Sequence, residues 1–157
     1  MAIETQFQPC CELTTSLQIL KEFIFSYMSS DEIDILMEAP KMDESFYLYK
    51  PILYVETMPG SDVNCGLGRR LPNGDRGKFH YVSLMLYWII SQDVGGMDRV
   101  RQLSDTLRYA FLTRGFELEQ AGLQKATCSS LREIPQATSS PFYGGRNLVT
   151  FRTLLSY

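Results

Sequence analysis

The sequence predicts an α+β fold, with a mainly antiparallel sheet and helices packed on one face, in the order α-β-β-α-β-β. Three observations lead to this prediction. Two stretches carry apolar residues at helical spacing, four stretches are rich in aromatic and branched residues, and Pro, Gly and Asn mark the turns between them. The 157 residues suffice for one hydrophobic core, so we expect a single domain over residues 1–157.

The first element expected is a helix that follows a flexible N-terminal arm, residues 1–12. Its apolar residues recur at steps of four, three, four and three, which places them on one helical stripe: Leu13, Leu17, Leu20, Ile24 and Tyr27. Ser29 with Glu32 resembles a capping box, so a second, short helix is expected as far as about Met37. Pro40 would end it.

The centre of the chain predicts a long hairpin. An extended segment, Ile52 to Met58, ends at a Pro-Gly turn, and residues 61–78 contain Asn73-Gly74, a strong signal for a tight turn. We therefore expect residues 61–78 to form the tip of the hairpin and Phe79 to Ile90 to form its returning strand. That strand is apolar on both faces, which indicates a position at the centre of the domain or coverage by a neighbouring subunit. Its two faces carry Phe79, Tyr81, Met85, Tyr87 and Ile89 on one side, and Val82, Leu84, Leu86, Trp88 and Ile90 on the other.

A second long helix is expected from Met97 to Leu112, with Gly115 as its C-terminal cap. On its solvated side Arg101 and Asp105 are expected to pair across one turn. The stripe expected to be buried is Met97, Val100, Leu103, Leu107 and Ala110.

Two extended segments are expected to complete the sheet. They are Leu123 to Ile134 and Leu148 to Ser156, with a polar, turn-rich loop from Pro135 to Arg146 between them.

Composition argues against several classes of protein. The formal net charge of −3 disfavours a general nucleic-acid binder, which needs excess Lys and Arg to neutralise phosphates. The longest apolar run, Tyr81 to Ile90, is far shorter than the about 20 residues that span a bilayer. The first residues lack the basic and apolar regions of a signal peptide. We therefore expect a protein made and kept in a cytosol, with its cysteines as free thiols.

The residue types give no pattern typical of catalysis. The four cysteines form no C-x-x-C pair and His80 is the only histidine, so no zinc site is expected. The glycines of Gly66-Leu67-Gly68 and Gly95-Gly96 are better explained as turns than as phosphate-binding loops. The sequence predicts no catalytic residue, no cofactor and no bound metal, and we expect a protein that is not an enzyme.

One charged cluster stands out in the hairpin tip of this acidic chain: Arg69, Arg70, Arg76 and Lys78. Two interpretations are open. The cluster is either a solvated loop whose charges oppose aggregation, or a contact arm whose guanidinium groups pair with carboxylates of another subunit. Under the second interpretation, pairing with phosphates is less favoured than pairing with carboxylates.

The order of elements resembles that of the tail terminator (tail completion) proteins of long-tailed bacteriophages, from about Leu13 onwards. The stretches that carry the resemblance are ILYVETMPG (Ile52–Gly60), GLGRRLPNGDRG (Gly66–Gly77), YVSLMLYWII (Tyr81–Ile90), GMDRVRQLSDTLRYAF (Gly96–Phe111) and NLVTFRTLLSY (Asn147–Tyr157).

The resemblance implies a virion protein of the tail or neck, assembled in the host cytoplasm. It implies a homo-oligomeric ring, typically a hexamer, that caps the tail tube and docks it to the neck. The partners would be other copies, the tail tube protein and the neck or head-connector protein, with no membrane, and with DNA passing through the lumen without specific binding. As a hypothesis, the subunit interface contains Arg69, Arg70, Arg76, Lys78, Tyr81, Tyr87 and Trp88.

Other classes of function remain open on the sequence. A head–tail connector or stopper subunit of the neck is also a small protein that forms a ring at the same junction. A small ferredoxin-like ligand-binding module shares the strand and helix content and would need a discrete pocket. An enzyme that uses carboxylates or tyrosines would need a polar pocket with perturbed pKa values.

Overall fold

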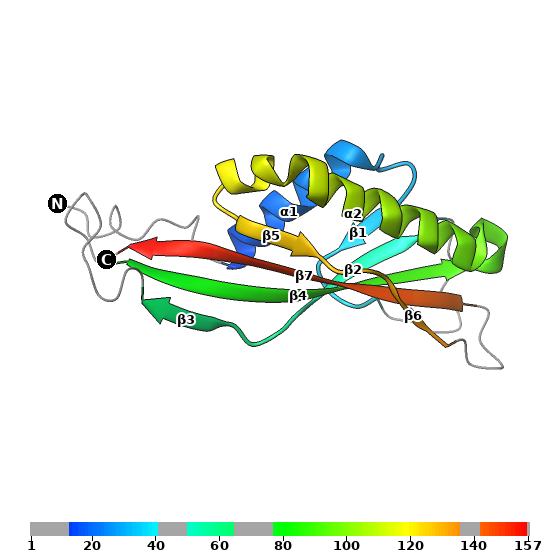
Figure 1. Ribbon diagram of the computed structural model, residues 1–157. Coiled ribbons are helices and arrows are strands. Elements are labelled where there is room, and N and C mark those ends of the chain that lie inside the picture. The colour runs from blue at the N-terminus through cyan, green and yellow to red at the C-terminus, as the bar shows by residue number, and fades with distance from the viewer. Residues whose placement is uncertain (1–12, 41–49, 65–76, 136–141, 157) are drawn as a thin grey trace.

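A computed structural model describes residues 13–40, 50–64, 77–135 and 142–156 of the chain. Within these ranges the protein has two layers: a mixed sheet, and two helices that pack on one side of it (Figure 1). The α+β class expected from the sequence is therefore confirmed.

The sheet is built around two long central strands. Its order is β1-β2-β4-β7-β5, with β3 also paired to β4 and β6 also paired to β7. All pairs are antiparallel except β1–β2, which is parallel, so the antiparallel character expected is only partly matched. The strands are β1 Asp34–Leu36, β2 Ile52–Thr57, β3 Ser61–Asn64, β4 Gly77–Ser91, β5 Gln124–Cys128, β6 Arg132–Ile134 and β7 Phe142–Ser156.

The prediction of a short helix that ends near Met37 is wrong, because this segment contains strand β1. Burial there alternates with period two: Ile33 and Ile35 are buried and Asp34 between them is exposed. The strand is held beside β2 by the Asp34 amide, which donates to the Pro51 carbonyl at 2.9 Å. A pattern this short is compatible with either a strand or one turn of helix. The pairing with β2 decides in favour of the strand.

The two helices are α1, Leu13–Tyr27, and α2, Gly96–Gln120. Helix α1 matches its prediction, whereas α2 extends well beyond Leu112 and contains Gly115 in its interior, so the expected cap at Gly115 is wrong. The buried stripe of α2 continues to Leu118, which is fully buried, and packing of that residue holds the last turns in helical form. Gly122, with φ of +105°, follows the end of the helix instead.

The loop expected from Pro135 to Arg146 is shorter, because β7 begins at Phe142 and pairs with β4 along its whole length. Gly144 and Gly145 explain why the strand was missed. A Cβ on Gly145 would lie 2.7 Å from Leu131 Cδ1, and one on Gly144 would lie 3.0 Å from the Trp88 carbonyl oxygen. Glycine is needed in this strand because neighbouring groups approach its backbone closely.

The core lies between the sheet and the helices. On β4 one of the two predicted faces points into it: Val82, Leu84, Leu86, Trp88 and Ile90 are all buried. From the helices, Phe23 of α1 meets Phe111 of α2 edge to face, with ring centroids 5.4 Å apart. The alternation read from the sequence of this strand is therefore confirmed.

A polar cluster sits inside this core, centred on the fully buried Asn147 of β7. Its Oδ1 accepts from Trp88 Nε1 at 2.8 Å and its Nδ2 donates to the Ser129 carbonyl at 2.9 Å. Its Nδ2 also lies 2.9 Å from Ser104 Oγ of α2. One side chain thus ties together β4, β7, α2 and the connection between β5 and β6.

Candidate interaction surfaces

One end of the sheet projects beyond the helix layer as an arm, which consists of β3, residues 77–81 of β4 and residues 152–156 of β7 (Figure 1). In it, Ser61 pairs with Tyr81 and Asn64 pairs with Lys78 on one side of β4, and Gly77 pairs with Ser156 on the other. The two central segments pair antiparallel, as expected for a hairpin, but the ends of the expected tip, residues 61–64 and 77–78, are strands, and residues 65–76 lie outside the described residues. The base of the hairpin is a three-stranded ribbon.

Of the predicted basic cluster, Arg69, Arg70 and Arg76 lie outside the described residues. Lys78 lies in the arm, where only its backbone is described. The arm also contains Arg152 of β7, a cation that was not part of the predicted cluster. The Arg152 guanidinium lies 3.8 Å from the centroid of the Phe79 ring, and its Nε donates to Gln124 Oε1 at 3.1 Å.

The side of the sheet opposite the helices is called the open face below, because no helix of the described residues covers it (Figure 1). Tyr54 of β2 and Tyr87 of β4 stack on it, with ring centroids 5.0 Å apart and an interplanar angle of 12°. Burial, then the neighbouring Tyr87 and Glu56, raises the pKa of Tyr54 above its usual value. Tyr81, in the arm on the same face, is 39% exposed.

Trp88, which the interface hypothesis included, lies on the opposite side of β4 from Tyr87 and is only 1% exposed. Its indole N–H is bound to Asn147 within the core. Since a core side chain cannot touch a neighbouring subunit, Trp88 does not belong with Tyr81 and Tyr87 as a contact residue. Its role is to hold β4 against β7 and the helices.

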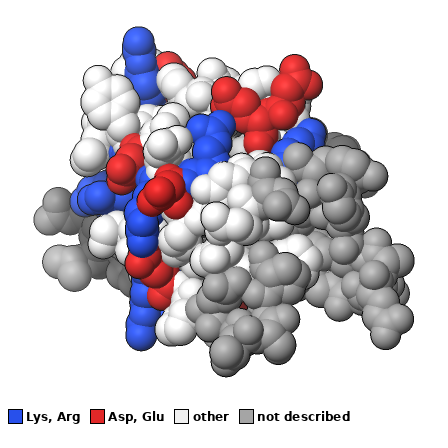
Figure 2. Space-filling model, turned by 90° about the vertical axis from the view of Figure 1, so that its right-hand side faces the viewer, with Lys and Arg blue, Asp and Glu red and all other residues white. Residues whose placement is uncertain are grey.

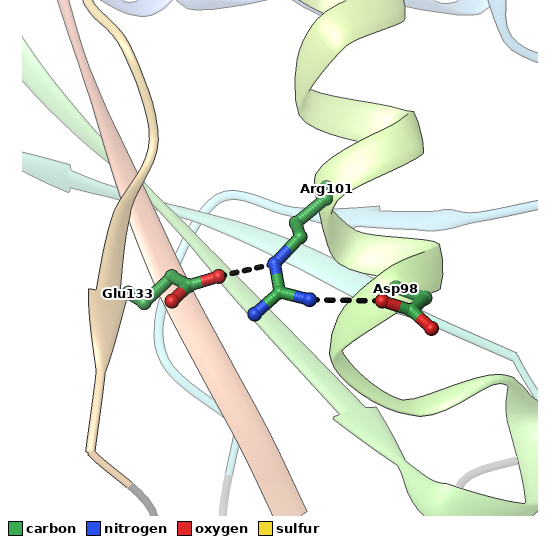
Figure 3. Close-up of polar contacts among 3 residues, drawn as sticks. All are labelled: Asp98, Arg101 and Glu133. Carbon is green, nitrogen blue, oxygen red and sulfur yellow. Dashed lines mark hydrogen bonds and ion pairs between the residues drawn. The ribbon is translucent and has the colours of Figure 1, made fainter.

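The end of the molecule where α2 begins carries charges of both signs, which alternate down one side of it (Figure 2). Near the start of α2, Arg101 donates from Nη1 to Asp98 at 2.8 Å and from Nε to Glu133 of β6 (Figure 3). The hydrogen bond that Arg101 donates to Glu133 is the main reason that the pKa of Arg101 is raised. Arg101 therefore links α2 to β6, instead of pairing with Asp105 as expected.

A shallow cleft adjoins this ion pair, between α2 and the connection from β5 to β6. Arg108 projects into it from α2, and its Nε, a buried atom, finds no hydrogen-bond acceptor among the described residues. Burial raises the pKa of the neighbouring Cys128 thiol to about 12, although the charge of Arg108 lowers it in part. A thiol with this pKa stays protonated near neutral pH and is a poor nucleophile. The cleft is lined by Arg101, Asp105, Arg108, Ser130, Leu131, Arg132 and Glu133.

The solvent-facing side of α2 carries an apolar stripe that was not identified in the sequence. Tyr109, Leu112 and Phe116 are 68%, 80% and 50% exposed. The signal is present, because steps of three and four residues place all three on one side of a helix, opposite the buried stripe. It was missed because the expected helix ended at Leu112, which left Phe116 outside it.

Comparison of the chain with protein-family models and with curated protein sequences gave no match. Neither α1 nor α2, the helices within the described ranges, is long and apolar enough to cross a membrane. In the same ranges, no three His, Cys, Asp or Glu side chains come together as a potential metal site.

Proposed function

We propose that the protein is a structural subunit that forms a ring at the head–tail junction of a bacteriophage, where it caps the tail tube and docks it to the neck. The observation that carries this proposal is the one-sided sheet: its open face bears stacked aromatic residues and runs on into an arm that extends past the helices (Figure 1). An apolar sheet face of this kind is a contact surface for another protein. The resemblance of the sequence to tail terminator proteins supports the same function.

A ring requires two different surfaces on each subunit, so that the contact repeats head to tail until it closes. The arm and the open face are such a pair. The arm of one subunit would reach the next one, where the guanidinium groups of Arg69, Arg70 and Arg76 pair with carboxylates. Tyr81 and Tyr87 would supply aromatic contact area, since tyrosine is enriched among the residues that dominate interface energies.

The charge of the surface fits the passage of DNA without specific binding. The chain has a net charge of −3, and the end shown in Figure 2 mixes both signs instead of forming a basic groove. A specific DNA-binding site would need a cluster of cations aligned with the phosphates. We therefore propose that DNA is cargo in the lumen of the ring and is not a ligand.

Two other functions predict different assemblies. A head–tail connector or stopper subunit would also form rings, but these would bind the head connector and not the tail tube. A ligand-binding module is favoured by one observation, the arginine-lined cleft beside Arg108, and would bind a small anion there as a small oligomer.

The test is the mass of the purified chain in solution, followed by negative-stain imaging with and without tail tubes. Rings seated on the ends of tubes are the expected result. The variant with Arg69, Arg70 and Arg76 all changed to Ser should stay folded and fail to form rings. A matched variant that loses the same charge elsewhere, Arg99, Arg114 and Arg132 to Ser, should still form them.

Two results would overturn the proposal. A strict monomer in the presence of tubes would exclude a terminator. Rings that form normally without Arg69, Arg70 and Arg76 would exclude the role given to these three arginines.

A further inference from the structure

A small hollow lies at the base of the arm, where β5 begins beside β7 (Figure 1). Its volume is about 100 Å³. Pockets for whole drug-sized ligands have about 300–1,000 Å³, so only a small chemical group fits here. The residues that line the hollow include two cations and two hydroxyl groups but no acid: Tyr81, Lys125, Thr150, Phe151 and Arg152.

Arg152 is oriented beside this hollow by neutral groups. It pairs with Tyr81 of β4, so the two side chains lie on the same side of the sheet, the open face. The Nε of Arg152 donates to Gln124 Oε1 at 3.1 Å, and its guanidinium lies 3.8 Å from the centroid of the Phe79 ring. Arg152 forms no ion pair with a described residue. Its charge is therefore not neutralised within the described part of the chain.

Lys125 comes to the same hollow through a β-bulge. From Gln124 to Thr127, β5 advances three residues while β7 advances only two, so β5 contains one extra residue. The side chains of Gln124 and Thr127 both bond to open-face residues of β7, and Ala126 packs against the core. The extra residue is therefore Lys125. A bulge redirects a side chain, and here it brings a second cation to the hollow.

The backbone of Lys125 is strained. Its φ is +51°, the only positive φ of a residue other than glycine in the described ranges. This conformation brings Cβ close to the following carbonyl oxygen, a strain that glycine avoids. Strained residues of this kind cluster at sites that bind ligands. A lysine where glycine would fit more easily indicates that the ammonium group itself is used.

We propose that this hollow binds a phosphate dianion, either free phosphate or the terminal phosphate of a small ester. The ammonium of Lys125 and the guanidinium of Arg152 neutralise its two charges, and the hydroxyl of Tyr81 donates to a further oxygen. The inference does not rest on the proposed ring, because the hollow is built within one chain.

The number of charges selects this ligand. A phosphate monoester carries a charge of about −1.5 to −2 at pH 7 and has three strong acceptor oxygens. A carboxylate carries one charge and would leave one of the two cations without a partner. The phosphodiesters of a DNA backbone also carry one charge each, so DNA passing through a ring is a poor ligand for this hollow.

The test is isothermal titration calorimetry of the full chain in a buffer without phosphate. The ligands are inorganic phosphate, methyl phosphate and adenosine monophosphate, with dimethyl phosphate and acetate as singly charged controls. The doubly charged ligands should bind with dissociation constants at least about tenfold lower than those of the controls. A further tenfold preference for inorganic phosphate over methyl phosphate identifies free phosphate as the ligand. The same preference for adenosine monophosphate over methyl phosphate identifies a nucleotide.

Lys125→Gly separates binding from folding. It removes both the ammonium and the strain, so the dissociation constant for inorganic phosphate should rise at least about tenfold while the melting temperature stays unchanged or rises. Arg152→Gln should weaken binding in the same way, and its melting temperature shows whether loss of the contact with Phe79 also affects the fold. The matched control is Arg114→Gln, which removes an exposed cation of α2 and should leave both quantities unchanged.

Three results would overturn the inference. They are no binding of inorganic phosphate at about 10 mM, acetate that binds as tightly as phosphate, and wild-type affinity in Lys125→Gly. Rings that form on tail tubes without any binding of phosphate refute this inference alone. Binding of phosphate by a chain that forms no rings refutes only the proposed ring.

Discussion

Replacement of Asn147 by Leu tests whether the buried polar cluster holds the fold together. Leucine has a similar volume but cannot bond, so the change leaves the Trp88 indole N–H and the Ser104 hydroxyl, both buried, without this partner. A buried polar group left unsatisfied costs about 1–3 kcal/mol, and two are created. The added apolar burial of leucine offsets part of this. We therefore expect the free energy of unfolding to fall by about 3 kcal/mol, which lowers the melting temperature by roughly 6–12 °C.

The measurement is a urea titration followed by fluorescence and circular dichroism. Trp88 is the only tryptophan in the chain, so its emission reports directly on the cluster. Thr150→Val, also in β7, is the matched control. It removes only an exposed hydrogen bond to Thr127 and should cost less than about 1 kcal/mol.

A double-mutant cycle makes this prediction refutable. If Asn147 stabilises the fold through Trp88, the loss caused by Asn147→Leu should be smaller in a Trp88→Phe background, by about 1 kcal/mol or more. Dichroism is the readout there, since the fluorophore is gone. A loss of stability below about 1 kcal/mol, or equal losses in the two backgrounds, would refute the role assigned to the cluster.

Three smaller predictions follow from other contacts. Above pH 9 the stability of the wild type should fall, because the unfolded thiol ionises first and the pKa of folded Cys128 is about 12. Cys128→Ala should remove up to about 1.4 kcal/mol per pH unit from that slope, measured by urea titration at several pH values. Tyr27→Phe removes the hydrogen bonds to Glu117 at 2.8 and 2.9 Å and should lower the free energy of unfolding at pH 7, and an unchanged free energy would show that these bonds contribute nothing. Arg101→Met should lower the free energy of unfolding only slightly, and less in high salt, because its ion pair with Glu133 is exposed; a loss that salt does not change would contradict this.

The sequence pattern alone was sufficient to predict an element that is long enough to show its own helical or extended periodicity. The stripe of α1 and the alternation of β4 were both readable from the sequence, because helical and extended periodicities differ over ten or more residues. Strand β1 has only three residues, Asp34–Leu36, and is defined by its contact with β2. The start of β7 was missed for a related reason: glycines that serve the packing of Leu131 and Trp88 look like a turn when read alone.

The prediction of contact surfaces was limited in the same way, because these surfaces depend on contacts between distant elements. The sequence identified two apolar faces on β4 but could not tell which one the helices would cover, so Trp88 and Tyr87 were treated alike. Only the packing of α1 and α2 makes one a core residue and the other a residue of the open face. The contact of Arg152 with Phe79 was equally hidden, since it joins residues on two strands that are distant in the sequence.

The pairing of β4 with β7 also affects how the chain reaches its fold. The paired residues lie between 51 positions (Ser91 and Phe142) and 79 positions (Gly77 and Ser156) apart in the sequence. During synthesis, β4 would leave the ribosome with one edge and its apolar open face exposed, and would wait for β7 to arrive. Such long-range pairing slows folding and lengthens the time in which strands can aggregate. A chaperone that shields β4 at this stage would be expected to raise the yield of soluble protein.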